Sequence, residues 1–155
     1  MTELFDWSAA IFVIGADGVV AVRKRAKDGS WGPWHLPGGK REPYELSVEE
    51  TALRELTEET GIRANAAPFT ILGHTPRVTF KHRKGTKKPY KHFYELFFCA
   101  VTLERVEASS LRSSDPHEQV RVIPFDEYRR MRGFFGLHRR FIKQYGLVPD
   151  ARKAA

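Results

Sequence analysis

Three glutamates, Glu55, Glu58 and Glu59, have the spacing of a shared metal site. In a helix each residue advances by about 100°, so the three carboxylates would fall within an arc of roughly 100° beside an apolar stripe. Like charges at these spacings disfavour an isolated helix, and a bound cation would compensate for them. Oxygen ligands select hard divalent ions, so the expected cofactor is Mg²⁺, with Mn²⁺ as a substitute. A solvated acidic face shows the same pattern, and the helix alone leaves both interpretations open.

A pair of glycines, Gly38 and Gly39, lies upstream of the glutamates and follows Leu36 and Pro37. Glycine lets the backbone approach a ligand closely, so the carbonyl of Gly38 could complete a metal site. Taken alone, the pair predicts only a tight turn.

Local patterns indicate which elements must position these groups. Ser47 and Glu50 have the form of an N-terminal capping box and Gly61 sits where a C-terminal cap is expected, which predicts a helix over 48–60. Apolar and β-branched runs predict strands, the first two of them as a hairpin, over 8–14, 18–25, 69–80, 93–103 and 119–123. Two late helices are also expected, one opened by Pro124 and one at about 137–145.

Composition favours one folded domain over residues 1–155. A chain of 155 residues that is 41% hydrophobic is ordinary for one compact domain and too short for two. The longest apolar run, 9–14, is far below the roughly 20 residues of a membrane-spanning helix, and no signal segment is recognisable. We therefore expect a soluble, cytoplasmic protein without a membrane partner. The single cysteine, Cys99, is expected in the core.

Positive charge is concentrated in one segment. The formal net charge is +7, and between Arg77 and His92 there are seven Lys or Arg residues and no acid. Such a segment attracts polyanions, whether nucleotide phosphate, nucleic acid or anionic lipid. A loop that only aids solubility fits the composition as well. The segment is expected to be a long connection between the strands 69–80 and 93–103.

The segment 38–62, GGKREPYELSVEETALRELTEETGI, resembles the Nudix box. The family pattern is Gly, five residues, Glu, seven residues, then Arg-Glu-aliphatic-x-Glu-Glu-x-Gly-aliphatic. The chain matches every fixed position from Arg54 onward, and Gly39 with Glu45 keeps the first spacing. Eight residues instead of seven separate Glu45 from Arg54, which we interpret as a one-residue insertion in the loop before Ser47.

The resemblance implies a fold and an activity. Segments 13–25 and 118–128 look like the opening hairpin and the late strand–helix unit of the family, so the similarity covers most of the chain. The implied fold is an α/β/α sandwich with a mixed β-sheet. The implied activity is Mg²⁺-dependent hydrolysis of a phosphoanhydride bond in a nucleoside diphosphate derivative or a nucleoside triphosphate, with a small nucleotide as the partner.

The resemblance also implies residue roles. The three glutamates would bind divalent metal together with the carbonyl of Gly38, while Arg54 would organise the carboxylates and pair with Glu45. The general base of the family lies either within the box or on a late loop. The candidate outside the box is Glu118, although a surface glutamate is the simpler interpretation, and Glu95 is less favoured.

Basic and aromatic side chains indicate which residues could contact the substrate. Arg23, Arg25 and the basic segment containing Arg77, Lys81 and Arg83 could meet phosphate charge. Three aromatic residues could stack on a base or simply anchor turns: Trp31, Trp34 and Tyr90.

Two other functions remain open. One is a Nudix-like module that binds a nucleotide or RNA without cleaving it, against which the complete glutamate set argues. The other is an RNA hydrolase, as in decapping, whose basic segment would guide the polymer. RNA as a partner is thus open but not favoured, and the sequence does not reveal the oligomeric state.

Overall fold

Two β-sheets form the centre of the computed structural model, which describes residues 6–82, 85 and 88–151. The first sheet has the strand order β3 (Gly38–Lys40), β1 (Trp7–Ile14), β5 (Pro89–Thr102) and β4 (Phe69–His82). β1 runs parallel to β5, while β1 with β3 and β4 with β5 are antiparallel, so this sheet is mixed. The second sheet pairs β2 (Gly18–Lys24) with β6 (Glu118–Pro124) in antiparallel register.

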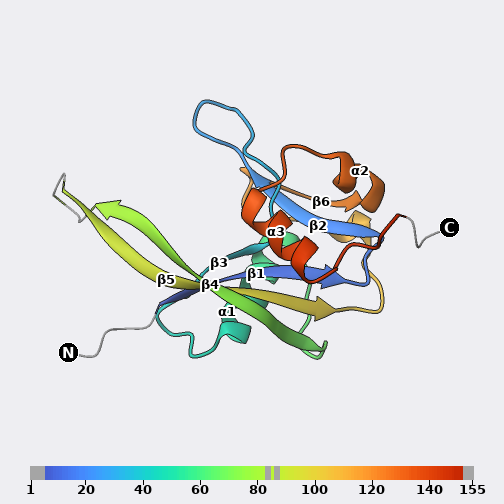
Figure 1. Cartoon of the computed structure of the whole chain (residues 1–155), viewed down its shortest axis with the longest axis horizontal. Helices are drawn as coiled ribbons and strands as arrows, with labels where there is room; N and C mark the ends of the chain where they lie inside the picture. The colour runs from blue at the N-terminus through green and yellow to red at the C-terminus, as the bar shows by residue number, and fades with distance from the viewer. Residues whose placement is uncertain (1–5, 83–84, 86–87, 152–155) are drawn as a thin grey trace.

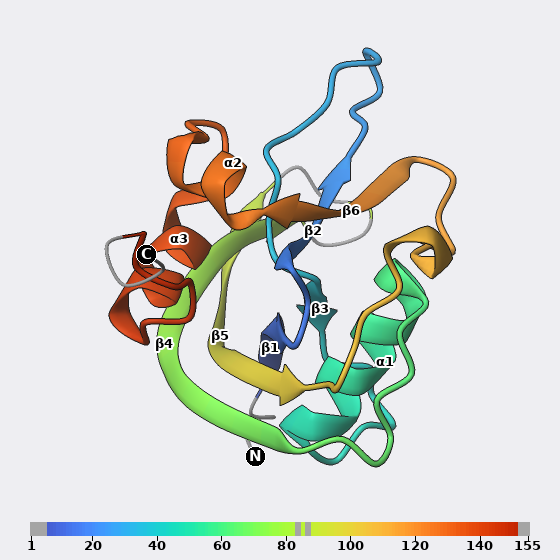
Figure 2. The same cartoon turned by 90° about the vertical axis from the view of Figure 1, so that its right-hand side faces the viewer.

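Helices cover both sides of the strands (Figure 2). Helix α1 (Val48–Thr60) lies on one side, and α2 (Phe125–Arg130) and α3 (Gly136–Gln144) lie on the other. A short 3₁₀ turn, η1 (Ala108–Ser110), precedes β6. The predicted α/β/α sandwich with a mixed sheet is therefore confirmed. Within the described residues, no helix combines the length and the apolar character needed to cross a membrane.

The predicted hairpin between the first two strands is wrong. β1 uses both of its edges for β3 and β5, and β2 instead pairs with β6, which is about 100 residues further along the chain. The reason is burial on both faces, because the first seven residues of β1 and the first five of β2 are all buried. Such continuous apolar runs are typical of internal strands, whose partners are not set by a neighbouring turn.

Two apolar layers hold the helices to the sheet. On one side Leu56 of α1 is fully buried with Ile11, Val13 and Cys99, which confirms the core position of the cysteine. On the other side Phe141 of α3 belongs to the second cluster.

In this second layer the rings of Phe98 and Phe141 stack with their centroids 4.6 Å apart. Because α1 and α3 are fixed on opposite faces by separate clusters, the residues of α1 that face away from the sheet are held in place without help from α3.

Helix α1 begins and ends where the sequence predicts. The Ser47 side chain accepts a hydrogen bond of 3.1 Å from the backbone N–H of Glu50. Gly61 adopts a left-handed φ of 79° and its N–H donates to the carbonyl of Thr57. These caps fix the rotation of the helix and therefore the direction of its glutamates.

The extra residue before the helix is absorbed at Leu46. Glu45 is buried at 2% exposure, whereas Leu46 directly after it is 82% exposed. The backbone N–H of Leu46 donates to the carboxylate of Glu50 at 3.0 Å. The insertion thus forms an outward bulge, and neither the buried glutamate nor the helix register is displaced.

β4 and β5 continue as a two-stranded arm beyond the rest of the molecule (Figure 1). The predicted strands 69–80 and 93–103 are confirmed, but each extends into the basic segment. Pairing persists from Arg77↔Tyr94 to His82↔Pro89. We call residues 77–82 and 88–94 the arm; Arg83, which was predicted to meet phosphate, lies outside the described residues.

We expect the two loop residues before α1 to differ in their effect on stability. Ser47→Ala should lower the free energy of unfolding by about 1 kcal/mol, because an N-terminal cap is lost. Leu46→Ser should change it by less than about 0.5 kcal/mol, since the side chain is already exposed. Urea unfolding measures both. A larger decrease in the free energy of unfolding for Leu46→Ser than for Ser47→Ala would contradict the assignment of the outward bulge to Leu46.

Candidate active site

Glutamates from two distant segments line one cleft of about 500 Å³. Helix α1 contributes Glu55, Glu58 and Glu59, and β6 contributes Glu118. The remaining lining residues come from β2, β3 and the loop before β6: Lys24, Gly38, Gly39, Lys40, Ser114 and Asp115. The structure therefore brings the three predicted metal-binding glutamates together, with Gly38 beside them. Their role in binding metal, including that of the Gly38 carbonyl, stays a prediction.

The two glycines of β3 are required by close packing on both sides of the strand. A Cβ at Gly38 would lie 2.0 Å from the carbonyl oxygen of Ala9 in β1. A Cβ at Gly39 would lie 2.4 Å from a carboxylate oxygen of Glu55. A side chain at Gly38 would push β3 away from the backbone of β1, whereas a side chain at Gly39 would displace the carboxylate of Glu55 from its present position in the cleft.

Arg54 joins the loop, the helix and β3 through five hydrogen bonds. Its Nε and Nη2 donate to the two oxygens of Glu45, both at 3.0 Å. Its Nη1 donates to Glu55 at 2.9 Å and to Glu58 at 3.1 Å, and Nη2 also donates to the carbonyl of Lys40 at 2.8 Å. The hypothesis that Glu45 still reaches Arg54 despite the insertion is confirmed.

The hydrogen bonds between Arg54 and Glu45 also affect the pKa values of both groups. Burial would raise the pKa of Glu45, but hydrogen bonds from Arg54, Thr51 and the backbone of Glu42 hold it below its ordinary value. Burial likewise opposes the charge of Arg54, yet its carboxylate partners raise its pKa above the ordinary value. Both groups are therefore charged at neutral pH, and the pair is a fixed brace.

Glu59 is the least compensated carboxylate of the cleft. It is 5% exposed, its Oε1 accepts a long contact of 3.4 Å from the N–H of Gly38, and its buried Oε2 has no hydrogen-bond partner among the described residues. Burial, followed by the negative charges of Glu118 and Glu55, raises the pKa of Glu59 to about 9. A buried, unpartnered acceptor among like charges suits a cation.

The donor set fits a hard divalent ion, since the cleft offers only oxygen from its acidic side chains. The oxygens do not yet form a complete ligand cluster within the described part of the chain. Arg54 holds one oxygen each of Glu55 and Glu58. Bound Mg²⁺ would therefore draw on Glu59 and on the carboxylate oxygens that face away from Arg54.

Glu118 reaches the cleft because of strand register. It is the direct cross-strand partner of Lys24, whose Nζ lies 3.7 Å from its carboxylate. Ser113 Oγ donates to its other oxygen at 3.1 Å, and the side chain is only 8% exposed. The simpler interpretation of Glu118 as a surface glutamate is therefore wrong. Glu95, the less favoured candidate, instead pairs with His74 at 3.0 Å and does not line the cleft.

Sequence reasoning missed two lysines of the cleft, Lys24 and Lys40. Lys40 directly follows the glycine pair, a position that could have drawn attention to it. Lys24 gave no such signal, because only the β2–β6 pairing brings it to Glu118. These ammonium groups are the positive charges that line the cleft among the described residues, and they suit phosphate oxygens.

The three predicted substrate arginines lie outside this cleft. Arg23 stacks on Trp31 and Trp34 at 4.6 and 4.7 Å and lines a neighbouring pocket of about 560 Å³ that shares Glu118 and Asp115 with the cleft. Arg25 stacks on Trp31 at 5.8 Å and donates to the carbonyl of Gly29.

The two tryptophans thus serve as packing surfaces for arginine in this structure. Arg77, the third arginine, lines a different cavity.

That cavity adjoins the cleft and is largely apolar. It holds about 230 Å³ and shares the three residues of β3 with the cleft. Its other walls include Tyr94 and Leu96 of β5 and His138 of α3. Burial lowers the pKa of His138 to about 3, so its ring is neutral. Since Nδ1 accepts a hydrogen bond of 3.0 Å from the N–H of Leu36, the ring proton resides on Nε2.

Solved structures place this fold in the Nudix class. The NUDIX domain of Shewanella oneidensis NrtR complexed with ADP ribose is 17% identical, with a TM-score of 0.64 over 93% of this chain and 88% of that one. The E. coli dihydroneopterin triphosphate pyrophosphohydrolase is 16% identical, with a TM-score of 0.64 over 92% and 97%. The MutT protein from Methanosarcina mazei Go1 is 19% identical, with a TM-score of 0.60 over 94% and 96%.

The sequence matches the NUDIX domain family over residues 4–145, and the chain therefore belongs to that family. The resemblance of segment 38–62 is thus confirmed. An RNA pyrophosphohydrolase from Erythrobacter litoralis is 36% identical over 59 residues, which span 38% of this chain and 35% of that protein.

The brace between Glu45 and Arg54 should show strong energetic coupling. In a double-mutant cycle with Glu45→Gln and Arg54→Gln, we expect a coupling of at least about 1 kcal/mol in the free energy of unfolding, because Arg54→Gln leaves the buried carboxylate of Glu45 without its cation. The exposed pair Arg121–Glu127 is the control and should give less than about 1 kcal/mol. Equal coupling energies in the two cycles would contradict the role of the Glu45–Arg54 pair as a brace.

Glu59→Gln should stabilise the metal-free protein above about pH 4.5, because burial next to Glu55 and Glu118 disfavours the ionised form of Glu59 that the unfolded chain adopts there. The folded pKa of Glu59 lies above the ordinary 4.5, so the folded state binds the extra proton between those values. Its contribution to stability therefore falls as pH rises from about 4.5 to about 9. In thermal unfolding with EDTA, the stability of the wild type should fall with rising pH relative to that of Glu59→Gln. The exposed Glu49→Gln is the control, and an identical pH dependence in all three would contradict the assignment.

Proposed function

We propose that this protein hydrolyses a phosphoanhydride bond of a nucleoside diphosphate derivative or a nucleoside triphosphate, with Mg²⁺ as the cofactor. The observation that carries this proposal is the buried carboxylate of Glu59, which has no hydrogen-bond partner for one oxygen and lies in a cleft with Glu55, Glu58 and Glu118. A cluster of this kind is costly without a cation, and a cation bound there would lie between the carboxylates and a phosphate group.

The three glutamates of α1 and the carbonyl of Gly38 would hold the metal. When bound, Mg²⁺ supplies charge neutralisation for the phosphate oxygens and lowers the pKa of a coordinated water. Arg54 already donates to two of the glutamates, so it acts as a positioning residue that keeps their unbound oxygens directed into the cleft.

The other charged residues of the cleft have separate roles. Lys24 and Lys40 would bind phosphate oxygens at its rim. Glu118 is our candidate for the proton acceptor, since it lies in the cleft without belonging to α1. Its carboxylate is held by Ser113 and Lys24, which would orient it toward a water beside the metal-binding carboxylates.

The adjoining apolar cavity supports a substrate with an organic group next to its phosphates. Because the cleft and the cavity share the residues of β3, the cavity is apolar space next to a diphosphate in the cleft. There Tyr94 and Leu96 offer apolar surface, and the neutral His138 offers one N–H donor, a combination that suits a nucleobase or a ribose. The names of the related proteins, which include a triphosphate pyrophosphohydrolase and an ADP ribose complex, agree with this class.

A hydrolysis screen tests the proposal. Nucleoside triphosphates, dinucleoside polyphosphates and nucleotide sugars are incubated with the protein and Mg²⁺ in ¹⁸O-labelled water, and the products are identified by mass. We expect one class to be cleaved and ¹⁸O to enter one phosphate product. Omission of metal should abolish turnover, and Mn²⁺ should restore it.

Variants distinguish the roles within the cleft. Glu59→Gln should lower kcat by a factor of about 10²–10³, because charge stabilisation in the transition state is lost, while folding stays intact. Glu118→Gln should lower kcat and remove the acidic limb of its pH profile. Glu49→Gln, on the same helix but exposed, is the matched control. Near wild-type turnover by Glu59→Gln would contradict the proposal. Absence of cleavage of any substrate with either metal would also contradict it and would favour a binding module.

A further inference from the structure

We propose that two copies of this chain form a dimer in which the arm of each copy packs on the loop 42–46 of the other. This inference goes beyond the proposed function, because it assigns a partner to two surfaces outside the cleft. Three observations carry it: an exposed apolar face on the arm, an exposed apolar pair on the loop, and opposite charges around the two surfaces.

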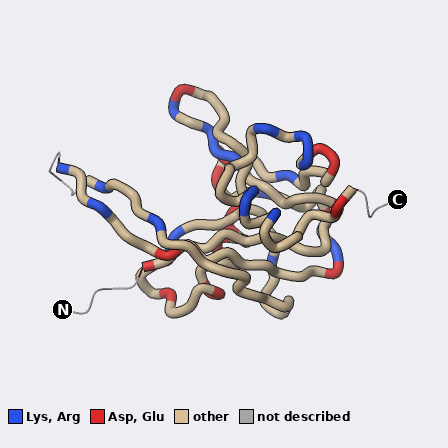
Figure 3. Tube along the Cα trace, in the orientation of Figure 1, with Lys and Arg blue, Asp and Glu red and all other residues tan. Residues whose placement is uncertain are grey.

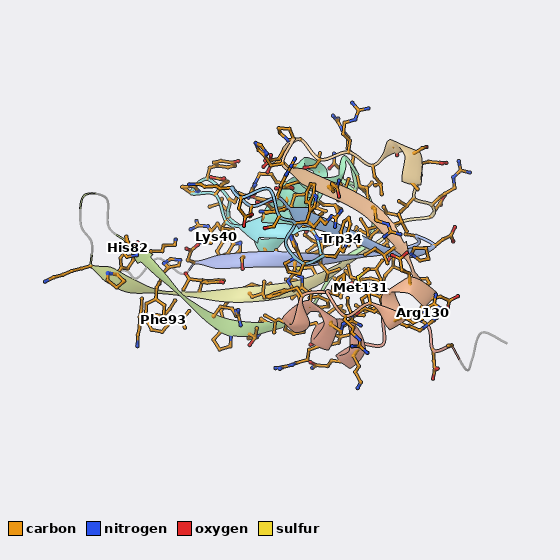
Figure 4. The ribbon with its side chains drawn as sticks, turned by 90° about the horizontal axis from the view of Figure 1, so that it is seen from above. Trp34, Lys40, His82, Phe93, Arg130 and Met131 are labelled. Carbon is orange, nitrogen blue, oxygen red and sulfur yellow. The ribbon has the colours of Figure 1, made fainter. Side chains whose placement is uncertain are left out.

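One face of the arm is apolar and open to solvent. The register pairs Val78 with Phe93 and Phe80 with Lys91, so these four side chains lie on the same face. Phe80 and Phe93 are 66% and 69% exposed, and Val78 is 46% exposed. Figure 4 shows Phe93 on the side of the arm away from Lys40. The ring face therefore points away from the cleft, and so large an apolar surface on a strand is typical of a contact with a partner.

The second apolar surface lies at the bulge formed by the inserted residue. Leu46 is 82% exposed, and Tyr44, two positions earlier, is 71% exposed. Their backbone is held in place, because Glu45 between them is buried and accepts two hydrogen bonds from Arg54. An insertion that presents leucine to solvent on a braced loop adds nothing to the core of its own chain. A partner would bury both side chains, and tyrosine is enriched at such contacts.

The charges around the two surfaces are opposite. On the arm Lys91 lies beside the rings, and neither it nor Lys88 forms an ion pair within the described ranges. At the loop Glu42 is exposed, and the carboxylate of Glu50 accepts a hydrogen bond from the N–H of Leu46. These two acids likewise lack a basic partner in the part of the chain that the structure describes. A basic apolar face and an acidic apolar loop complement each other, which favours a second copy as the occupant.

The two surfaces are placed for a reciprocal contact. In Figure 3 the basic arm and the acidic loop before α1 lie toward the same end of the molecule. The arm pairs six residues of each strand, from Arg77↔Tyr94 to His82↔Pro89, and is therefore about 20 Å long. A two-fold axis would set two arms in opposite directions, so that each arm reaches the loop at the base of the other. The same contact then occurs twice and closes the dimer.

An anionic membrane would satisfy only one of the two surfaces. It would attract the lysines and rings of the arm, but it would repel the acids of the loop. Tyr44 and Leu46 would then remain in water. Two arms packed ring face to ring face would bring like charges together and would also leave the loop uncovered. Contact between the arm of one copy and the loop of another covers both surfaces.

Sedimentation velocity over a range of protein concentrations tests the dimer. The arm variant is Phe80→Ser/Phe93→Ser and the loop variant is Tyr44→Ser/Leu46→Ser, and none of these residues lines the cleft. The control is Ile71→Ser, which removes an exposed apolar side chain of β4 outside the arm. We expect the control to dimerise like the wild type. Each variant should raise the dissociation constant at least about tenfold, because aromatic anchors dominate an interface. Added salt should weaken the wild-type dimer, because it screens the opposite charges.

A mixture of the two variants tests which surfaces meet. One arm variant and one loop variant together keep one intact contact, between the unchanged arm of the loop variant and the unchanged loop of the arm variant. With a fluorophore on one species, the mixture should associate more tightly than either variant alone and less tightly than the wild type. In dilute solution, where the copies are separate, both variants should unfold at the same urea concentration as the wild type. Loss of the dimer is then distinct from loss of the fold.

Four results would overturn the inference. The first is a wild type that stays monomeric at every concentration. The second is a set of equal dissociation constants for the wild type and both variants, which would place the interface elsewhere. The third is a mixture no tighter than its components, which would mean that the arm packs on another arm. The fourth is binding to phosphatidylserine vesicles that the arm variant abolishes, without any dimer. None of these readouts involves hydrolysis, so they are independent of the proposed function.

Discussion

The geometry of the cleft depends on the guanidinium of Arg54. One planar group with five donors reaches the loop through Glu45, the helix through Glu55 and Glu58, and β3 through the carbonyl of Lys40. A lysine could neutralise the same charge but could not hold three elements in one plane. The burial of Glu45 makes this arrangement rigid, because its carboxylate is also held by Thr51 and by the backbone of Glu42.

Glu59 receives no hydrogen bond from that guanidinium, in contrast to Glu45, Glu55 and Glu58. Arg54 neutralises the carboxylates nearer the solvent, whereas Glu59 is left buried with Glu118 and Glu55 as charged neighbours. The surrounding core can tolerate the strain, since Ala52 and Leu56 on the same helix are fully buried. A residue that costs stability in the last turn of a well-packed helix is typical of a site kept for binding rather than for folding.

The features that could be predicted from the sequence are those set by interactions between residues close together in the chain. The caps of α1, its length and the shared direction of its glutamates all follow from residues within a few positions of one another. The role of Glu118 and the presence of Lys24 depend on the β2–β6 register, in which residues about 100 positions apart become neighbours. The same long-range pairing explains why the predicted hairpin of the first two strands was wrong, because a run that is apolar on both faces does not identify its partner.

The three residues of β3 show how one short strand can serve two cavities. Gly38 lies against the backbone of β1, Gly39 lies against the carboxylate of Glu55, and Lys40 extends over the rim shared by the cleft and the apolar cavity. The order of charges from outside to inside is therefore basic at the arm and the rim and acidic at the centre. A polyanion is attracted by the lysines and opposed by the acidic centre, where Arg54 and Lys24 already offset the charges of Glu55, Glu58 and Glu118. On the proposed function, metal binding and substrate binding would be thermodynamically coupled, each increasing the affinity for the other, because a bound cation would offset the acidic groups that oppose the substrate.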